Sequence, residues 1–253
     1  MTDIFADHFA PVAAHYATFR PHYPAALFAW LANLAPDHVL AWDCAAGSGQ
    51  ASADLAAHFD RVVATDASAS QIAVAAPHPQ VDYRVASAEA SGLPTASVDL
   101  ITVAQALHWF DLDRFYAEVR RVLKPGGVLA VWSYGVLTVA EAAVNSQLQR
   151  FYQETVGPYW PPERRHVENG YQSLPFPFPE LQPPAFAMEA SWTLPELLGY
   201  CRSWSASERY HAECGHDPVI ELAAELTSLW RWPNQRQLIT WPLALRVAKK
   251  PTE

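Results

Sequence analysis

The sequence predicts an α/β fold built around a central, mostly parallel sheet. Three observations favour this class. An apolar run at 39–42 ends in an acid and leads into a small-residue loop and a helix-forming stretch. Further apolar runs alternate with helical patterns as far as residue 132. The 253 residues, 51% of them hydrophobic, suffice for one domain of ordinary size with an elaboration.

The first strand–loop–helix unit spans residues 39–59. Its apolar run is bounded by Asp43, and the stretch 50–59 repeats Ala, Leu and Phe at helical spacing. Between them, residues 44–49 carry almost no side chains. Such a loop lets the backbone approach a ligand closely and directs the first N–H groups of the helix toward it.

The residue three positions after Gly49 indicates which ligand this loop suits. A dinucleotide-binding loop has the pattern G-x-G-x-x-G, but Gly47 and Gly49 are followed by Ser52. Asp43 would repel a phosphate and suits a cationic or amine-bearing ligand. A nicotinamide-dependent oxidoreductase is therefore disfavoured, although it stays an alternative, as does a scaffold that binds a cofactor without chemistry.

These residues resemble the first motif of the class I S-adenosylmethionine-dependent methyltransferases, an acid followed by a glycine-rich loop. The resemblance implies that Asp43, Ala45, Gly47 and Gly49 contact S-adenosylmethionine. Ala45 stands where the family usually has its first glycine. An alanine there predicts that this position needs no positive φ.

A second apolar run, 61–65, ends in Asp66. This acid lies about 20 residues beyond the loop, the separation at which an acid reaches a ribose hydroxyl. We therefore assign Asp66, with the adjacent Ala67, to the cofactor. The alternative is that Asp66 caps the helical stretch that begins at Ser68.

The third predicted strand, 81–86, leads into a turn at 87–94. This turn resembles the adenine-contacting turn of the same family. The resemblance implies that a backbone N–H near Ala88 bonds a ring nitrogen and that Ser87 or Glu89 bonds the exocyclic amine. Family members more often carry Asp where Ser87 stands, and a neutral hydroxyl is the poorer acceptor.

The fourth predicted strand, 97–103, precedes the pattern Gln-Ala-x-His-Trp-Phe at 105–110. This pattern resembles a narrower group that includes the trans-aconitate type methyltransferases. By itself a histidine such as His108 is more often a core or capping residue than a ligand-binding one, but open α/β sheets bind ligands at the carboxyl ends of central strands. We assign Gln105 to the cofactor and His108 and Trp109 to the methyl acceptor.

A helix at 112–123 should begin at Asp111 or Asp113 and stop at the Lys-Pro-Gly-Gly stretch 124–127, before a fifth strand at 128–132. The order of these elements closely resembles the methyltransferase domain. The resemblance implies a Rossmann-like sheet of seven mostly parallel strands flanked by helices.

The N-terminal segment carries Tyr16 and the sequence Arg-Pro-His-Tyr-Pro at 20–24, ahead of a helix at 25–34. The segment resembles the leader of the same narrower group, where it folds over the cofactor as a lid. There Arg20 would meet the cofactor carboxylate, to which a guanidinium binds bidentately, and Tyr16 would border the reacting centre. The alternative is a solvated turn.

Beyond residue 132 the pattern changes. We expect a helix at 140–155, a Pro-rich aromatic loop to 184, strands at 187–192 and 238–247, and helices at 194–203 and 219–229. Pro242 favours an edge or a bulge in the last strand. The domain would comprise a lid and helix (1–36), a cofactor-binding core (37–135), a substrate cap (136–186) and C-terminal strands and helices (187–253).

Arg164 and Arg165 lie within the predicted cap of a chain whose net charge is −9. They are candidates for holding an anionic acceptor. The alternative is that they only pair with Glu163 or Glu168 in a solvated loop.

Net charge and cysteine content exclude several partners. An acidic chain is a poor match for nucleic acid or an anionic membrane. Three cysteines without C-x-x-C spacing do not suggest a disulfide framework, and no signal peptide or membrane-spanning run is present, so we expect a cytoplasmic protein. His211, Cys214 and His216 lack a fourth ligand, so no metal is expected.

The predicted function is methyl transfer from S-adenosylmethionine to a small molecule, with a carboxylic acid as the favoured acceptor and a methyl ester as the product. A carboxylate needs no base. A hydroxyl or a carbon acid would need one, and the candidates are His108 and Tyr16. The sequence does not specify the acceptor or the oligomeric state.

Overall fold

The computed structural model describes residues 21–232 and 234–252. At its centre lie five parallel strands in the order β3-β2-β1-β4-β5. Their bounds are Leu40–Cys44 (β1), Arg61–Asp66 (β2), Val81–Val85 (β3), Val98–Ala104 (β4) and Leu123–Tyr134 (β5). The order reverses between β1 and β4, which is where open α/β sheets bind ligands.

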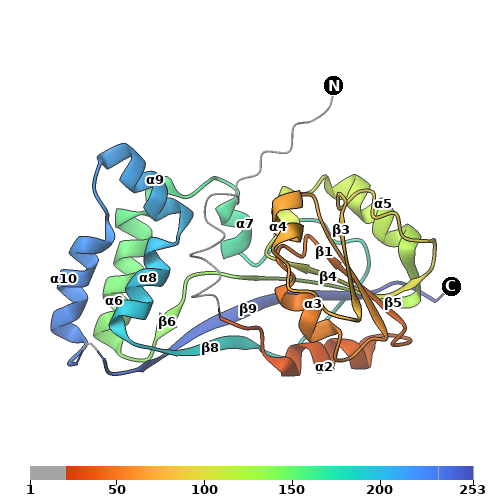
Figure 1. Cartoon of the computed structure of the whole chain (residues 1–253), viewed down its shortest axis with the longest axis horizontal. Coiled ribbons are helices and arrows are strands. Elements are labelled where there is room, and N and C mark those ends of the chain that lie inside the picture. The colour runs from red at the N-terminus through yellow and green to blue at the C-terminus, as the bar shows by residue number, and fades with distance from the viewer. Residues whose placement is uncertain (1–20, 233, 253) are drawn as a thin grey trace.

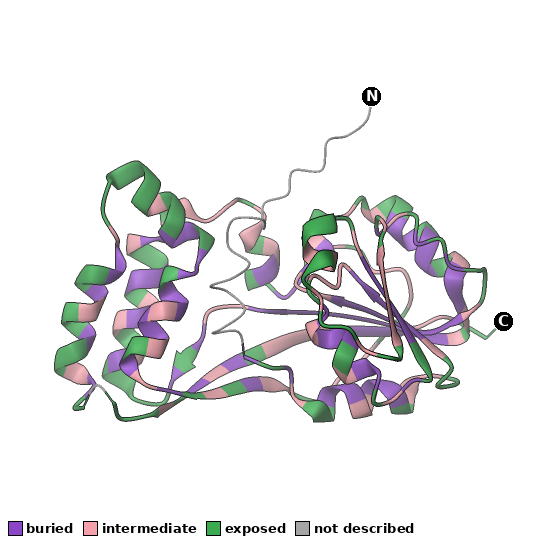
Figure 2. Ribbon diagram, viewed as in Figure 1, coloured by how far each residue is buried: buried purple, intermediate pink, exposed green. Residues whose placement is uncertain are grey.

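Helices cover both faces of this sheet (Figure 1). Their bounds are Ala25–Leu34 (α2), Gln50–Leu55 (α3), Ala69–Ala73 (α4) and Leu112–Val122 (α5). Strands β1 and β4 are almost entirely buried and the edge strand β3 is only half-buried, whereas α5 is buried on one side and exposed on the other (Figure 2). The sequence prediction of an α/β fold with a mostly parallel core is therefore confirmed.

Two apolar clusters explain why the helices pack where they do. On one face, Leu27 and Leu31 of α2 pack against a cluster that includes Leu55 of α3. On the other face, Phe115 and Val119 of α5 join a separate cluster. The Asp111 side chain caps α5 by accepting a hydrogen bond from the Arg114 N–H at 3.2 Å, as the spacing of apolar residues predicted.

The last strand, β9 (Gln237–Lys249), connects the core to a second layer. Its C-terminal half pairs antiparallel with β5 and with β7 (Glu180–Leu181). Its N-terminal half pairs with β8 (Ala187–Trp192) and β6 (Thr138–Val139). Within the part of the chain that the structure describes, the sheet therefore has nine strands instead of the expected seven, because β9 extends beyond the core and leaves room for further short strands.

Pro242 lies at the junction of these two halves. It is opposite Ala187 of β8, and the pairing of β9 with β5 begins only at Leu243. A proline lacks the N–H that a ladder bond needs, so it fits the point where a strand changes partners.

A helical lobe stands beside the core and contacts it through β8 and β9 (Figure 1). It consists of α6 (Ala142–Arg150), its continuation η2 (Phe151–Thr155), α8 (Leu194–Arg202), α9 (Ser205–Cys214) and α10 (Val219–Leu229). Helix α10 packs against α6 and α8. The sequence analysis missed α9 because only Ala206 and Ser207 of that helix are buried, so it has no apolar stripe.

The segment expected to be a long Pro-rich loop contains a short helix, α7 (Arg164–Glu168). This helix packs against β5, where the Ser133 hydroxyl donates to the Val167 carbonyl at 3.1 Å. The loop expectation was therefore wrong here. The role of 136–186 as a substrate cap stays a prediction.

Within residues 21–232 and 234–252, no helix has the length and apolar character needed to cross a bilayer. In the same part of the chain, no three His, Cys, Asp or Glu side chains gather in a way that would hold a metal ion. The cytoplasmic location stays a prediction.

Candidate functional site

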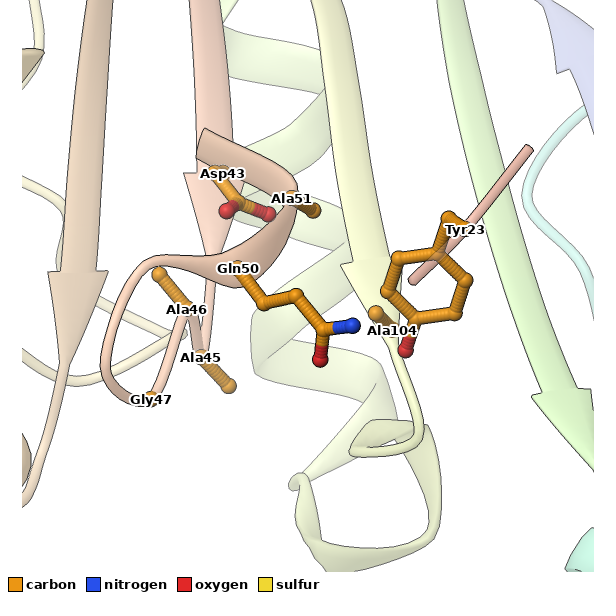
Figure 3. Close-up of a pocket in the computed structure, with 8 residues that line it drawn as sticks. All are labelled: Tyr23, Asp43, Ala45, Ala46, Gly47, Gln50, Ala51 and Ala104. Atoms are coloured by element: carbon orange, nitrogen blue, oxygen red, sulfur yellow. The ribbon is translucent and has the colours of Figure 1, made fainter. Parts of the chain in front are cut away.

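A pocket opens at the carboxyl ends of β1 and β4, where the strand order reverses (Figure 3). Its walls come from the loop after β1, the first turn of α3, the end of β4 and the segment before α2. The lining residues are Tyr23, Asp43, Ala45, Ala46, Gly47, Gln50, Ala51 and Ala104. Three of the predicted cofactor residues are therefore brought together here.

The loop after β1 has a left-handed backbone at three positions. The φ angles are 55° at Ala45, 56° at Gly47 and 87° at Gly49. The prediction that position 45 needs no positive φ was therefore wrong. Two loop bonds enforce the turn, from the Ala46 N–H to the Thr65 carbonyl at 2.9 Å and from the Gly49 N–H to the Ala46 carbonyl at 3.0 Å.

Gly49 is required for space as well as for its φ angle. A Cβ atom there would lie 2.7 Å from Cε1 of Tyr83, whereas a Cβ at Gly47 would meet only Oε1 of Gln71, at 3.7 Å. Gly49 therefore lets α3 start close to β3.

Asp43 lies beneath the loop with 1% of its surface exposed. One carboxylate oxygen accepts from the Ser52 hydroxyl at 2.6 Å and the other from the Thr102 hydroxyl at 2.8 Å. Burial raises the pKa of Asp43 from 3.8 to about 6, and these two hydrogen bonds oppose the shift. The nearby charge of Asp66 adds to the rise. Direct contact between Asp43 and a ligand stays a prediction, since its oxygens already have protein partners.

Asp66 ties the end of β2 to the loop. One oxygen accepts from the Gly47 N–H and the other from the Ser68 N–H, both at 2.8 Å. The cap of α4 is Ser68, whose side chain accepts from the Gln71 N–H at 3.4 Å. The alternative of Asp66 as a helix cap therefore does not describe this structure. The contact of Asp66 with a ribose stays a prediction.

Gln50 is a pocket residue that the sequence analysis missed. Its side-chain amide donates to the Pro21 carbonyl at 2.6 Å, and it extends into the space beside Tyr23 and Ala104 (Figure 3). Its carbonyl oxygen Oε1 is buried without a hydrogen-bond partner among the described residues. A buried acceptor in a pocket favours a ligand with an N–H or O–H donor. The only signal in the sequence was a polar residue at the first position of the helix.

The predicted adenine turn follows β3. Ala88 is buried, whereas Ser87 and Ala67 are exposed. Glu89 accepts a hydrogen bond from the Asp111 N–H at 3.2 Å, which joins this turn to the start of α5. Gln105, with a φ of 59°, instead donates its side-chain amide to the Tyr134 carbonyl at 2.9 Å. Gln105 therefore fixes the end of β4 against β5, and its contact with the cofactor stays a prediction.

His108 lies in a short 3-10 turn, η1 (Leu107–Trp109), directly after β4. Its Nδ1 atom is 3.0 Å from the hydroxyl of Tyr171, and its ring lies against the ring of Trp109, with centroids 4.6 Å apart. The pKa of His108 is lowered to about 4, mainly by burial and also by the positive charge of Arg164 and the proximity of His166, while Glu163 opposes the shift. His108 is therefore neutral at pH 7.

The two predicted acceptor arginines have different surroundings. Arg165 is exposed. Arg164 donates to the Tyr152 hydroxyl at 2.9 Å, and its guanidinium carbon lies 4.6 Å from the ring centroid of Trp160. Its Nε atom is also 3.9 Å from a carboxylate oxygen of Glu168, so the predicted pairing with that acid exists but is long. Of these two arginines, only Arg164 has a charge that contributes to the lowered pKa of His108.

Two further site predictions, Tyr16 as a possible base and Arg20 as a carboxylate ligand, fall on residues 1–20. These residues lie outside the described part of the chain.

A small-residue loop at the switch point of a doubly wound sheet, followed by an acid at the end of the next strand, defines a class of α/β protein that binds nucleotide-like cofactors. Within this class, residues 42–131 match the family model described as a methyltransferase domain.

Relatives over the whole chain agree with this match. A Dictyostelium discoideum protein described as a methyltransferase is 34% identical over 233 residues, which cover 90% of this chain and 88% of that protein. An uncharacterised methyltransferase of Schizosaccharomyces pombe is 30% identical and covers 89% of each chain. A solved structure from Anaeromyxobacter dehalogenans, described as a type II methyltransferase, is 48% identical, covers 92% of this chain and 99% of its own, and has a TM-score of 0.89.

The chain therefore belongs to the class I S-adenosylmethionine-dependent methyltransferases. Its cofactor is S-adenosylmethionine. This membership favours methyl transfer over the nicotinamide-dependent alternative that the sequence left open.

The left-handed alanine gives a first prediction. Ala45→Gly should raise the free energy of unfolding by about 1 kcal/mol, because glycine adopts a positive φ without the steric penalty that alanine has. Ala46→Gly is the matched control: its φ is not positive, so glycine should lower stability there through its greater freedom in the unfolded chain. Urea denaturation at pH 7 measures both. Equal effects of the two substitutions would contradict the strain at Ala45.

The buried acid gives a second prediction. Below about pH 4 Asp43 is protonated in both the folded and the unfolded state, and its contribution to stability is fully present. That contribution is lost as the pH rises through the folded pKa of about 6. The free energy of unfolding of the wild type, relative to Asp43→Asn, should therefore fall by about 2 to 3 kcal/mol between pH 4 and pH 7.

Denaturation curves at each pH unit test this difference. Asp60→Asn is the control, because Asp60 is exposed, and its difference from the wild type should stay flat. A flat difference for Asp43→Asn as well would show that its carboxyl is not destabilised by burial.

Proposed function

We propose that this methyltransferase acts on a small molecule bearing a carboxylate and that the product is its methyl ester. The support comes from two parts of the structure, the pocket after β1 and the side chains around His108. The net charge of −9 favours a small acceptor over nucleic acid.

The pocket fits the amino acid part of S-adenosylmethionine. Its lining includes the acid Asp43 and the Oε1 atom of Gln50, which has no hydrogen-bond partner among the described residues, and its loop has no bulky side chain. Acceptor oxygens of this kind match an ammonium group. Asp66, with Ala67 beside it, would bind the ribose. The turn that contains Ser87, Ala88 and Glu89 would bind the adenine.

When bound, S-adenosylmethionine supplies a methyl carbon that its sulfonium already activates. The residues of this chain then need to hold the acceptor in line and to exclude water. An acceptor that arrives ionised needs nothing else, whereas a hydroxyl needs a base.

The observation that carries the proposal is that His108 is a weak base next to a fixed positive charge. A pKa of about 4 leaves its imidazole unable to hold the proton of a hydroxyl acceptor at neutral pH. The charge of Arg164 that contributes to this shift is itself a partner for a carboxylate. A carboxylate oxygen loses its negative charge as it bonds to the methyl carbon, so no proton has to be removed.

Aromatic side chains hold Arg164 in place for this role. Its guanidinium lies over the rings of Trp160 and Tyr152, with its Cζ atom 4.6 and 5.7 Å from their centroids. The Tyr152 hydroxyl also donates to Glu168 at 2.6 Å. A guanidinium fixed on two sides loses little side-chain entropy when it binds an anion.

A third prediction tests the cofactor part. Asp66→Ala should weaken S-adenosylmethionine binding by about 1 to 3 kcal/mol, because a charged partner of the ribose is lost. The substitution also frees the Gly47 N–H, so calorimetry should compare S-adenosylhomocysteine with an analogue that lacks the ribose hydroxyls. If both ligands lose the same affinity, Asp66 serves to hold the loop and does not bind the ribose.

A fourth prediction tests the acceptor part. Arg164→Met should raise the Michaelis constant for a carboxylate acceptor roughly 10- to 100-fold, because a charge-assisted hydrogen bond is lost. Arg165→Met is the matched control on the adjacent, exposed position and should behave as the wild type. Cofactor affinity should be unchanged in both variants.

The acceptor screen for this test should contain small carboxylic acids, phenols and amines. Methylation confined to phenols or amines would refute the carboxylate assignment and leave the methyltransferase activity intact. Equal Michaelis constants for the two arginine variants would show that Arg164 does not bind the acceptor.

A further inference from the structure

Arg246 is a buried cation outside the sites described so far. It lies on β9, 5% exposed, in a half-strand whose other residues are apolar apart from the terminal Lys249. Its Nη1 atom donates to the carbonyls of Tyr171 and Leu174 at 2.6 and 2.8 Å. Its Nε and Nη2 atoms donate to both carboxylate oxygens of Glu180 at 2.9 and 2.7 Å. One side chain therefore fixes both ends of the segment 171–180.

Tyr171, at the start of that segment, has a strained backbone. Its φ is +62°, directly after Gly170 at +63°, and such a conformation persists only where the surroundings enforce it. The Tyr171 N–H donates to the His166 carbonyl at 2.8 Å, and the Tyr171 carbonyl accepts from Arg246. The backbone N–H and the backbone carbonyl of Tyr171 are therefore both hydrogen-bonded.

The side chain held in this way contacts His108. Tyr171 is completely buried, its hydroxyl is 3.0 Å from Nδ1 of His108, and the two rings are stacked with an interplanar angle of 26°. Within residues 21–232 and 234–252, the hydroxyl of Tyr171 has one hydrogen-bond partner, Nδ1 of His108. Burial raises the pKa of Tyr171 far above its usual value, so the phenol keeps its proton.

The direction of the bond to His108 follows from this arrangement. A completely buried phenol needs an acceptor for its proton, and Nδ1 of His108 lies 3.0 Å away, so the Tyr171 hydroxyl donates to that nitrogen. A neutral imidazole that accepts at Nδ1 carries its proton on Nε2. Around this pair lie Arg164, His166 and Glu163 on the side of His108, and Tyr23 and Tyr134 on the side of Tyr171.

We propose that Tyr171 and Arg246 are positioning residues that hold His108 in its Nε2–H tautomer. In this form His108 donates a hydrogen bond to an oxygen of the acceptor instead of removing a proton from it. The tautomer follows from contacts within the chain, whereas the bond to the acceptor rests on the proposed function.

The tautomer can be measured without any acceptor, by nitrogen NMR of the ¹⁵N-labelled histidine rings in the full chain, with His108→Gln identifying the signal. We expect the wild type to show an unprotonated Nδ1 and a protonated Nε2. Tyr171→Phe should shift the ratio toward the Nδ1–H form by roughly five- to tenfold, the loss of one hydrogen bond. Tyr116→Phe is the matched control, because its buried hydroxyl bonds the Pro175 carbonyl of the same segment at 2.8 Å but does not touch His108.

Arg246→Lys tests the second positioning residue. A lysine keeps the charge but cannot reach two carbonyls and a carboxylate together, so the tautomer ratio should shift in the same direction as in Tyr171→Phe. Urea denaturation confirms that the variant is folded before its spectrum is compared. An Nδ1–H tautomer in the wild type, or a Tyr171→Phe spectrum identical to that of Tyr116→Phe, overturns the proposal. An unchanged tautomer ratio in the folded Arg246→Lys variant would show that Arg246 is not a positioning residue.

Kinetics separate this proposal from the proposed function. Tyr171→Phe should raise the Michaelis constant for the acceptor about five- to tenfold while cofactor affinity stays unchanged. A screen that finds only neutral acceptors overturns the carboxylate assignment, and the NMR result stands independently of it. A shifted tautomer with an unchanged Michaelis constant overturns the contact between His108 and the acceptor.

Discussion

The cofactor pocket depends on two carboxylates that hold one loop. Asp43 joins β1 to Ser52 of α3 and to Thr102 of β4, and Asp66 joins the end of β2 to Gly47. The two elements that flank the loop, β1 and α3, are therefore joined beneath it, and the loop itself is bonded to the end of β2. Burial of Asp43 destabilises its charge, as its raised pKa indicates, but its hydrogen bonds hold β1, β4 and α3 together around the site at which the ligand would bind.

The sequence predicted the parts of the fold that local patterns encode. Apolar runs located β1 to β4 and β8, and the acid at position 111 located the start of α5. The failures have a common physical origin. Ala45 adopts a positive φ in a turn that the neighbouring Ala46 N–H bonds to Thr65 on another strand, and α9 forms without an apolar stripe of its own. Neither cause can be recognised from the short stretch of sequence over which a pattern of apolar residues is assessed.

The site residues divide in the same way. Asp43, Ala45 and Gly47 meet at one pocket as the loop motif predicted, because a motif is a local feature. Gln50 and Arg246 were missed because their roles depend on partners far along the chain. Arg246 contacts Tyr171, 75 positions away, and only the unusual presence of a charge in an apolar strand marked it in the sequence. The different surroundings of Arg164 and Arg165 could also be seen only in the structure, because neighbouring residues on a short helix face different ways.

The proposed acceptor site is assembled from two parts that are anchored differently. His108 and Tyr171 are tied to the core, because Arg246 lies on β9 directly opposite Val131 of β5. Arg164 is tied to the helical lobe, through Tyr152 of η2 and through Trp160, whose ring packs on Trp204 between α8 and α9. On the proposed function, the core therefore orients the reacting oxygen while the lobe supplies the charge that recognises the acid. A change in how the lobe packs would then alter which acid is accepted, because the lobe positions Arg164, whereas the described pocket for the methyl donor is lined by the loop after β1 and its neighbours.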